Sequence, residues 1–87
     1  MTKNFTGFNF KRHQAVGKYL SDAHIYFVAL DEEISNCYGK SSKASKLVSR
    51  LCSVLDLLRE ELDDRVHEEN PVHIDQELAR VYYPRGE

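Results

Sequence analysis

Residues 37–44 read CYGKSSKA, and this short stretch decides the fold because a long amphipathic pattern lies on each side of it. Gly39 stands where the left-handed residue that follows a helix is usually a glycine. Either of the next serines, Ser41 or Ser42, could cap the start of a second helix. A connection this short makes two long helices antiparallel neighbours. The stretch therefore predicts a helical hairpin.

The pattern before the turn predicts a helix over residues 10–38, with Asn9 as its N-cap. Apolar residues recur there at alternating steps of four and three, which keeps one face of an α-helix continuously apolar. This stripe consists of Val16, Leu20, Ala23, Phe27, Leu30, Ile34 and Cys37. Tyr19 and Tyr26 flank the stripe and widen it.

The same spacing continues after the turn and predicts a second helix over residues 43–69. Its stripe consists of Ala44, Val48, Leu51, Leu55, Leu58 and Leu62. Leu47 and Val54 extend that stripe to one side, so the apolar face is wider than a pair of helices needs. Asn70 and Pro71 end the helix, because proline disfavours helical geometry in the residue before it.

The charges give a second argument for the hairpin. A fold at about residue 40 places side by side those residues of the two helices whose numbers add up to about 81. Acidic residues 31–33 then fall next to Lys46 and Arg50. At the open end, basic residues fall opposite acidic ones: Lys11, Arg12 and Lys18 opposite Asp63, Asp64, Glu68 and Glu69. Exposed ion pairs add little stability, so this pattern bears on register and orientation.

The chain is expected to form one helical domain over residues 1–87, with an arm (1–9), a hairpin (10–69) and a tail (70–87). The tail carries Ile74, Leu78, Val81 and Tyr82, which predict a short helix folded back on the hairpin. A strand over residues 80–83 is the alternative. The fold class expected is therefore all-α, with the hairpin dimerising into a four-helix bundle.

Composition limits the classes of function. The 87 residues are 41% hydrophobic and 30% charged, with a net charge of −2 and a pI near 6.1. These values are typical of a folded chain and exclude a polycation that would hold nucleic acid or an anionic membrane by overall charge. The sequence has no signal-peptide core and no apolar run of membrane-spanning length, so we expect a cytoplasmic location and no membrane. Cys37 and Cys52 are expected to be buried free thiols in a reducing compartment.

No arrangement of residues predicts catalysis or a cofactor, so we expect a protein that is not an enzyme. Metal binding at the open end is one alternative function. Asp64 and His67 lie three residues apart on one helical face, with His13 nearby across the hairpin. A solvated, charged helix end is the simpler interpretation. His24 is interpreted as an ordinary boundary residue.

Nucleic-acid binding at the turn is the other alternative. Lys40, Lys43, Lys46 and Arg50 follow one another with no acidic residue among them, and Tyr38 could stack on a base. The neighbouring acidic residues 31–33 and the overall negative charge argue against it.

The sequence therefore favours a small interaction or adaptor protein that acts as a homodimer. The residues expected in the core and dimer interface are Leu20, Phe27, Leu30, Ile34, Val48, Leu51, Leu55, Leu58 and Leu62. The residues expected to bind a partner protein, because the hairpin does not obviously bury them, are Phe5, Phe8, Phe10, Leu78, Val81 and Tyr82.

Overall fold

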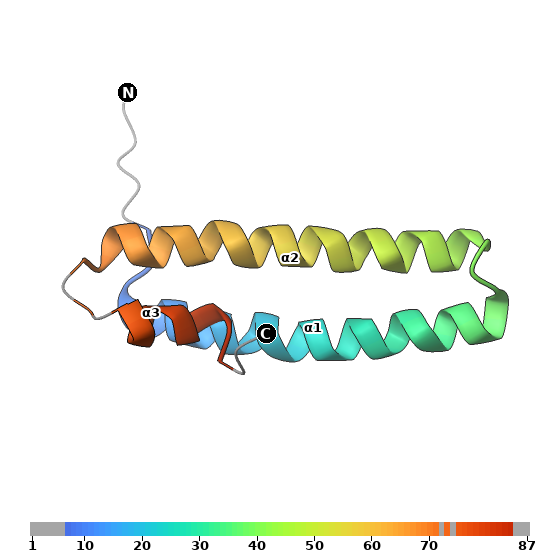
Figure 1. The fold of residues 1–87 in the computed structure, drawn as a ribbon, viewed down its shortest axis with the longest axis horizontal. Coiled ribbons are helices and arrows are strands. Elements are labelled where there is room, and N and C mark those ends of the chain that lie inside the picture. The colour runs from blue at the N-terminus through green and yellow to red at the C-terminus, as the bar shows by residue number, and fades with distance from the viewer. Residues whose placement is uncertain (1–6, 72, 74, 85–87) are drawn as a thin grey trace, which may run out of the picture.

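The computed structural model describes residues 7–71, 73 and 75–84, and within these ranges it contains three helices and no strand. Helices α1 (Phe10–Tyr38) and α2 (Lys43–Glu69) run antiparallel, and the short α3 (Asp75–Tyr82) lies at the open end of the hairpin (Figure 1). The predicted all-α hairpin with a short C-terminal helix is confirmed, with the bounds of both long helices. The strand alternative for residues 80–83 is wrong.

Local signals place the ends of the long helices. The side-chain oxygen of Asn9 accepts a hydrogen bond from the backbone N–H of Arg12 at 2.8 Å, as an N-cap does. Gly39 adopts a φ of 92° and donates its backbone N–H to Ser35, closing α1. Ser42, and not Ser41, caps α2 by accepting from the N–H of Ser45 at 3.1 Å.

Contacts across the hairpin establish its register. The hydroxyls of Ser35 and Ser45 lie 2.8 Å apart, and the Cys52 thiol donates to the carbonyl of Phe27 at 3.5 Å. The numbers in each pair add up to nearly the expected 81. The ion pairs that suggested this register do not form, since within the described ranges no acidic residue of 31–33 lies within 4.0 Å of a Lys46 or Arg50 nitrogen. Packing and short polar contacts therefore set the register.

Both cysteines are free thiols, but they are not both buried as predicted: Cys52 is half-buried, and Cys37 is exposed near the end of α1.

The seam of α2 is the strip that it turns toward α1. Its buried and half-buried residues alternate by three and four: Ser45, Val48, Cys52, Leu55, Arg59, Leu62 and Val66. The predicted stripe was rotated from this seam, because Leu51 and Leu58 lie beside it and are 44% and 45% exposed. Two apolar strips lie next to each other on α2, and the predicted stripe combined residues from both of them. Of the other expected core residues, Val48 is buried, and the rest are half-buried: Leu20, Phe27, Leu30, Ile34, Leu55 and Leu62.

The hydrophobic core lies at the open end, where all three helices meet. It consists of Val66, Leu78, Val81 and Tyr82, with Phe10, Val16, Leu20, Leu62 and Tyr83 packed around it. The expectation that the tail offers Leu78, Val81 and Tyr82 to a partner is therefore wrong about their placement. An eight-residue helix must bury its apolar face to persist, and α3 buries it against its own hairpin.

The arm residues differ from one another. Phe10 is half-buried against the core, whereas Phe8 is 39% exposed and rests its ring edge on His13 at a centroid distance of 5.3 Å. Phe5 lies outside the described residues.

A glycine lets α3 approach α1 closely. Gly17 lies inside α1 and is buried, and a Cβ built on it would overlap the backbone carbonyl of Val81. One helical turn further on, Ser21 is buried as well. Small side chains at these two positions leave room for the backbone of α3.

Candidate interaction surface

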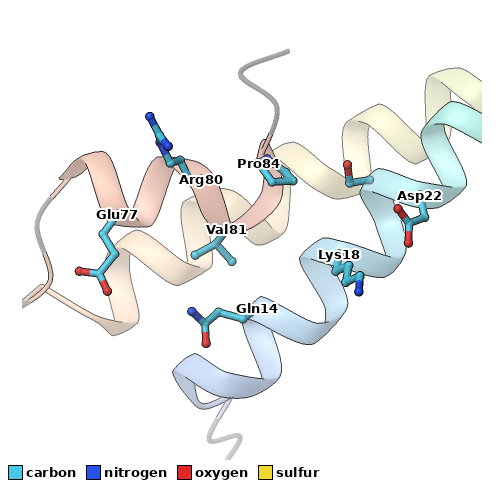
Figure 2. Close-up of a pocket in the computed structure, with 8 residues that line it drawn as sticks. Gln14, Lys18, Asp22, Glu77, Arg80, Val81 and Pro84 are labelled. Atoms are coloured by element: carbon cyan, nitrogen blue, oxygen red, sulfur yellow. The ribbon is translucent and has the colours of Figure 1, made fainter.

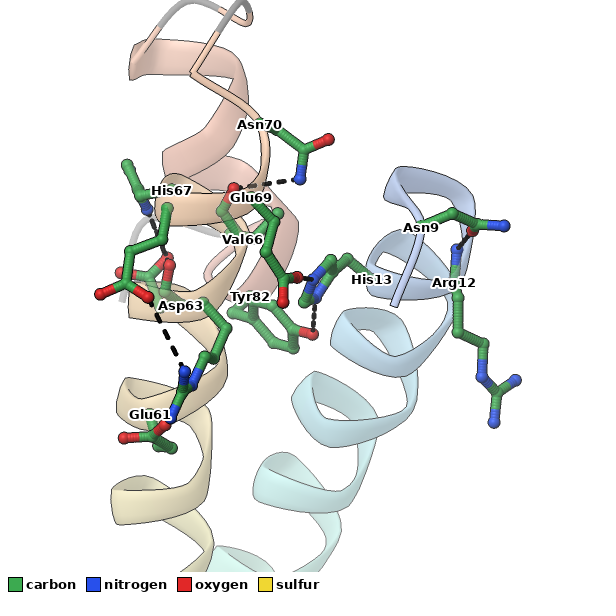
Figure 3. Close-up of polar contacts among 12 residues, drawn as sticks. Asn9, Arg12, His13, Glu61, Asp63, Val66, His67, Glu69, Asn70 and Tyr82 are labelled. Carbon is green, nitrogen blue, oxygen red and sulfur yellow. Dashed lines mark hydrogen bonds and ion pairs between the residues drawn. The ribbon is translucent and has the colours of Figure 1, made fainter. Parts of the chain in front are cut away.

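A buried histidine joins the three helices. The His13 ring of α1 is 1% exposed, with Nδ1 2.6 Å from the Tyr82 hydroxyl of α3 and Nε2 2.7 Å from a Glu69 carboxylate oxygen of α2 (Figure 3). One neutral tautomer satisfies both contacts, since Nε2–H donates to Glu69 and the Tyr82 hydroxyl donates to Nδ1. Both buried nitrogens then have partners.

Two features hold the C-terminal end of α3. Burial raises the pKa of Tyr82 to about 12, and the negative charges of Glu69 and Asp63 act in the same direction. The phenol therefore stays protonated and available to donate at neutral pH. Arg59 of α2 is 1% exposed, donates to the Tyr82 carbonyl at 2.7 Å and lies 4.6 Å from the centre of the Tyr83 ring.

An acidic group completes this end of the hairpin. Asp63 keeps one carboxylate oxygen buried without a hydrogen-bond partner. Burial raises the pKa of Asp63, His67 lowers it, and Asp64 raises it again. Because His67 donates its Nδ1–H to the Asp63 backbone carbonyl at 2.8 Å, its ring is committed to the helix (Figure 3). This contact lies within α2, so it holds the His67 ring against its own helix and does not direct it at a ligand.

The residues of the metal-binding alternative are engaged elsewhere or exposed. His13 is bound to Glu69 and Tyr82, His67 is bound to the backbone of Asp63, and Asp64 is exposed. In the described part of the chain, no group of three or more His, Cys, Asp or Glu residues is arranged to hold a metal ion.

An open groove runs between α1 and α3 (Figure 2), and its volume is about 580 Å³. Lys18 and Asp22 line it from α1, and Glu77 and Arg80 line it from α3. Because charges of both signs alternate around an open space, the groove favours no ligand of a particular charge.

An exposed apolar feature of the described residues is a second strip along α2, here called the outer strip. Leu47, Leu51, Val54 and Leu58 form it at steps of four, three and four, and they are 50%, 44%, 56% and 45% exposed. Each lies one position before a seam residue, so the outer strip borders the seam on one side. It is an apolar helix face that the described part of the chain leaves about half-exposed.

The outer strip and α3 lie on opposite sides of the hairpin. Tyr83, just after α3, shares a small pocket with Asp56 and Glu60, which lie one position after seam residues and hence across the seam from the outer strip. On α1, α3 packs on Gly17, whereas Tyr19 and Tyr26 point to the other side and are 68% and 62% exposed. Both long helices thus contribute to one uncovered face.

The basic residues at the turn are all exposed. Lys40 lies in the turn, and Lys43, Lys46 and Arg50 follow on the first turns of α2. Tyr38 beside them is 71% exposed. Among the described residues, no carboxylate lies within 4.0 Å of a side-chain nitrogen of these four, so they are more available than the sequence suggested.

Comparisons with protein-family models, with curated proteins and with solved structures find no match to this chain. Among the described residues, no helix combines the length and the apolar character needed to cross a bilayer. The candidate interaction surface is therefore identified from the geometry of the chain itself. It is the exposed apolar face formed by the outer strip together with Tyr19 and Tyr26.

Proposed function

We propose that this chain is a small, non-enzymatic interaction protein of adaptor or regulatory character that acts as a homodimer in the cytoplasm. Two hairpins would pack face to face as a four-helix bundle. The observation that carries the proposal is the outer strip with Tyr19 and Tyr26 beside it, a broad apolar face on an otherwise complete fold.

The outer strip is an apolar surface that the fold leaves about half-exposed. On that side α1 and α2 have only each other, since α3 packs on the opposite side of the hairpin. Fully burying one leucine or valine side chain contributes about 1.5–3 kcal/mol, so leaving four of them half-exposed forgoes several kcal/mol. A second copy related by a two-fold axis presents the same face and buries both at once.

Light scattering after size exclusion, at several protein concentrations, tests the proposal. The expected mass is about twice the 10.1 kDa of one chain. If the mass stays that of one chain at all concentrations up to about 100 μM, the affinity of any dimer is too low to be useful in a cell. That result overturns the homodimer.

A second candidate is nucleic-acid binding through the basic turn, which the exposure of Lys43, Lys46 and Arg50 favours. Fluorescence anisotropy with a labelled single-stranded oligonucleotide, at 50 and 200 mM salt, tests it. Binding that falls with salt, and that falls further when Lys43 and Lys46 are replaced by alanine, supports this function. Anisotropy that stays at the free-probe value at 50 mM salt rejects it.

A further inference from the structure

We infer that the second copy docks along the outer strip with its own outer strip antiparallel, so that the turn of one copy lies toward the open end of the other. This inference rests on the proposed homodimer and specifies its surface and orientation. Within it, Leu47 packs beside the partner's Leu58, and Leu51 packs beside the partner's Val54.

The spacing of the outer strip fits this occupant. The steps of four, three and four read the same in both directions along α2. A two-fold axis perpendicular to α2, near residues 52 and 53, therefore places each apolar side chain of the strip beside an apolar side chain of the second copy. Such an isologous contact needs a self-complementary surface, and this strip provides one.

The opposite side of the hairpin is unsuited to a second copy. At the open end α3 already covers it, and beyond α3 the α2 residues on that side are polar: Ser49, Ser53, Asp56 and Glu60. Ile25 and Val28 of α1, each 47% exposed, add apolar area there.

Tyr19 and Tyr26 suit the rim of the proposed contact. They lie on α1 on the side away from α3, as the outer strip does on α2, and more than half of each side chain is exposed. Tyrosine covers apolar surface with its ring while its hydroxyl remains in water. The pair thus widens the interface without adding a buried unpaired group.

The charges at the two ends of the outer strip are complementary. Lys43 lies four residues before Leu47, and Glu61 lies three residues after Leu58; both are exposed. The antiparallel arrangement brings Lys43 of each copy next to the partner's Glu61. Exposed pairs of this kind favour one orientation more than they add affinity. Glu61 also accepts from Arg65 of its own helix at 2.7 Å, which holds its carboxylate on that face.

The surface is tested with two matched substitutions, Val54→Arg and Val28→Arg. Both replace a roughly half-exposed helical valine, one on the outer strip and one on the side of α3. Sedimentation equilibrium should show that Val54→Arg weakens dimerisation at least 100-fold, while Val28→Arg changes it less than threefold. Helical content from circular dichroism should remain that of the wild type in both.

The outcomes separate the two proposals. A wild-type protein that stays monomeric refutes the homodimer itself. A wild-type dimer that Val54→Arg leaves intact, or that Val28→Arg weakens as much, overturns the outer strip as the interface while the homodimer stands.

The orientation is tested by pulsed electron paramagnetic resonance. A spin label is attached to Ser41→Cys at the turn, in a chain where Cys37 and Cys52 are replaced by serine; Ser41 is exposed. The antiparallel arrangement places the two labelled positions about 35 Å apart, from the rise of 1.5 Å per residue. A distance under about 25 Å means that the turns lie together and overturns the orientation.

Discussion

The two ends of the hairpin use one helical pattern in different ways. At the open end a third helix covers the pair, and Val66 and Tyr82 are completely buried. Near the turn the pair has no cover, and Leu47, Val54 and Tyr26 remain half-exposed or more. Periodicity is the same throughout, so burial depends on whether a third element packs against that side of the pair; on the side away from α3, Tyr19 is 68% exposed even at the open end. The difference indicates that the open end buries a core where α3 packs, whereas the turn half leaves apolar residues of both helices exposed.

Polar residues follow the same division. His13 and Arg59 are each 1% exposed at the open end, where both contact α3. Near the turn, the seam is closed by the small Ser35 and Ser45, which bond to each other directly. The larger polar groups are buried only where α3 supplies partners for them.

The largest expected effect is that of Tyr82→Ala at the open end. It removes a completely buried ring and one of the two partners of His13, so unfolding in urea should show a loss of about 3–5 kcal/mol. The control Tyr38→Ala, at 71% exposure near the turn, should change stability by less than about 0.5 kcal/mol. Equal losses in the two variants would remove the distinction between the ends.

Gly17→Ala should lower stability by about 1–3 kcal/mol, because the added methyl overlaps the Val81 carbonyl and displaces α3. In an uncrowded helix the same change stabilises by roughly 1 kcal/mol. The sign of the change in thermal midpoint therefore reports whether α3 is docked. A higher midpoint for the variant would mean that α3 does not pack on α1.

His13→Phe keeps a ring of similar shape but removes both hydrogen bonds, leaving the Tyr82 hydroxyl without its partner. The expected loss is about 1–3 kcal/mol. Adding Tyr82→Phe should recover part of this loss, since it removes the orphaned hydroxyl. A double-mutant cycle by urea unfolding measures the coupling, and strictly additive losses would refute the contact.

The smallest expected effect is the pH-dependent change in stability caused by Asp63→Asn. Burial raises the pKa of Asp63 above its usual 3.8, so the folded state favours the protonated carboxyl. That contribution is fully present below pH 3.8 and is lost as pH rises through the raised value. Asp63→Asn should therefore be slightly more stable than the wild type at pH 7, with no such gain at pH 3. A gain of equal size at both pH values, measured by urea unfolding, would contradict this cause.

The sequence predicts the helix bounds well because local signals determine them. Asn9, Gly39 and Asn70 act within a turn of their own position, and the structure uses all three as caps. The docking of α3 was harder to predict, since it depends on residues that are not apolar. His13 extends the stripe of α1 by one step, and Arg59 occupies a seam position between Leu55 and Leu62. A polar residue at such a position does not by itself predict a buried side chain.

The close packing of α3 at Gly17 could not be predicted from the sequence either. Nothing within its own helix requires a glycine, and its role depends on the approach of α3 from far along the chain. The sequence also does not separate the two strips on α2, because the spacing of Leu51 and Leu58 fits either strip. Only the position of α1 separates the seam from the outer strip.

Hydrogen–deuterium exchange at two protein concentrations tests most directly whether the turn half needs a second copy. Well above the dimer dissociation constant, amides of residues 47–58 should exchange slowly. On dilution below it, they should lose protection by at least tenfold, while residues 59–66 and 75–82 change much less. Protection of residues 47–58 that does not depend on concentration would contradict the account.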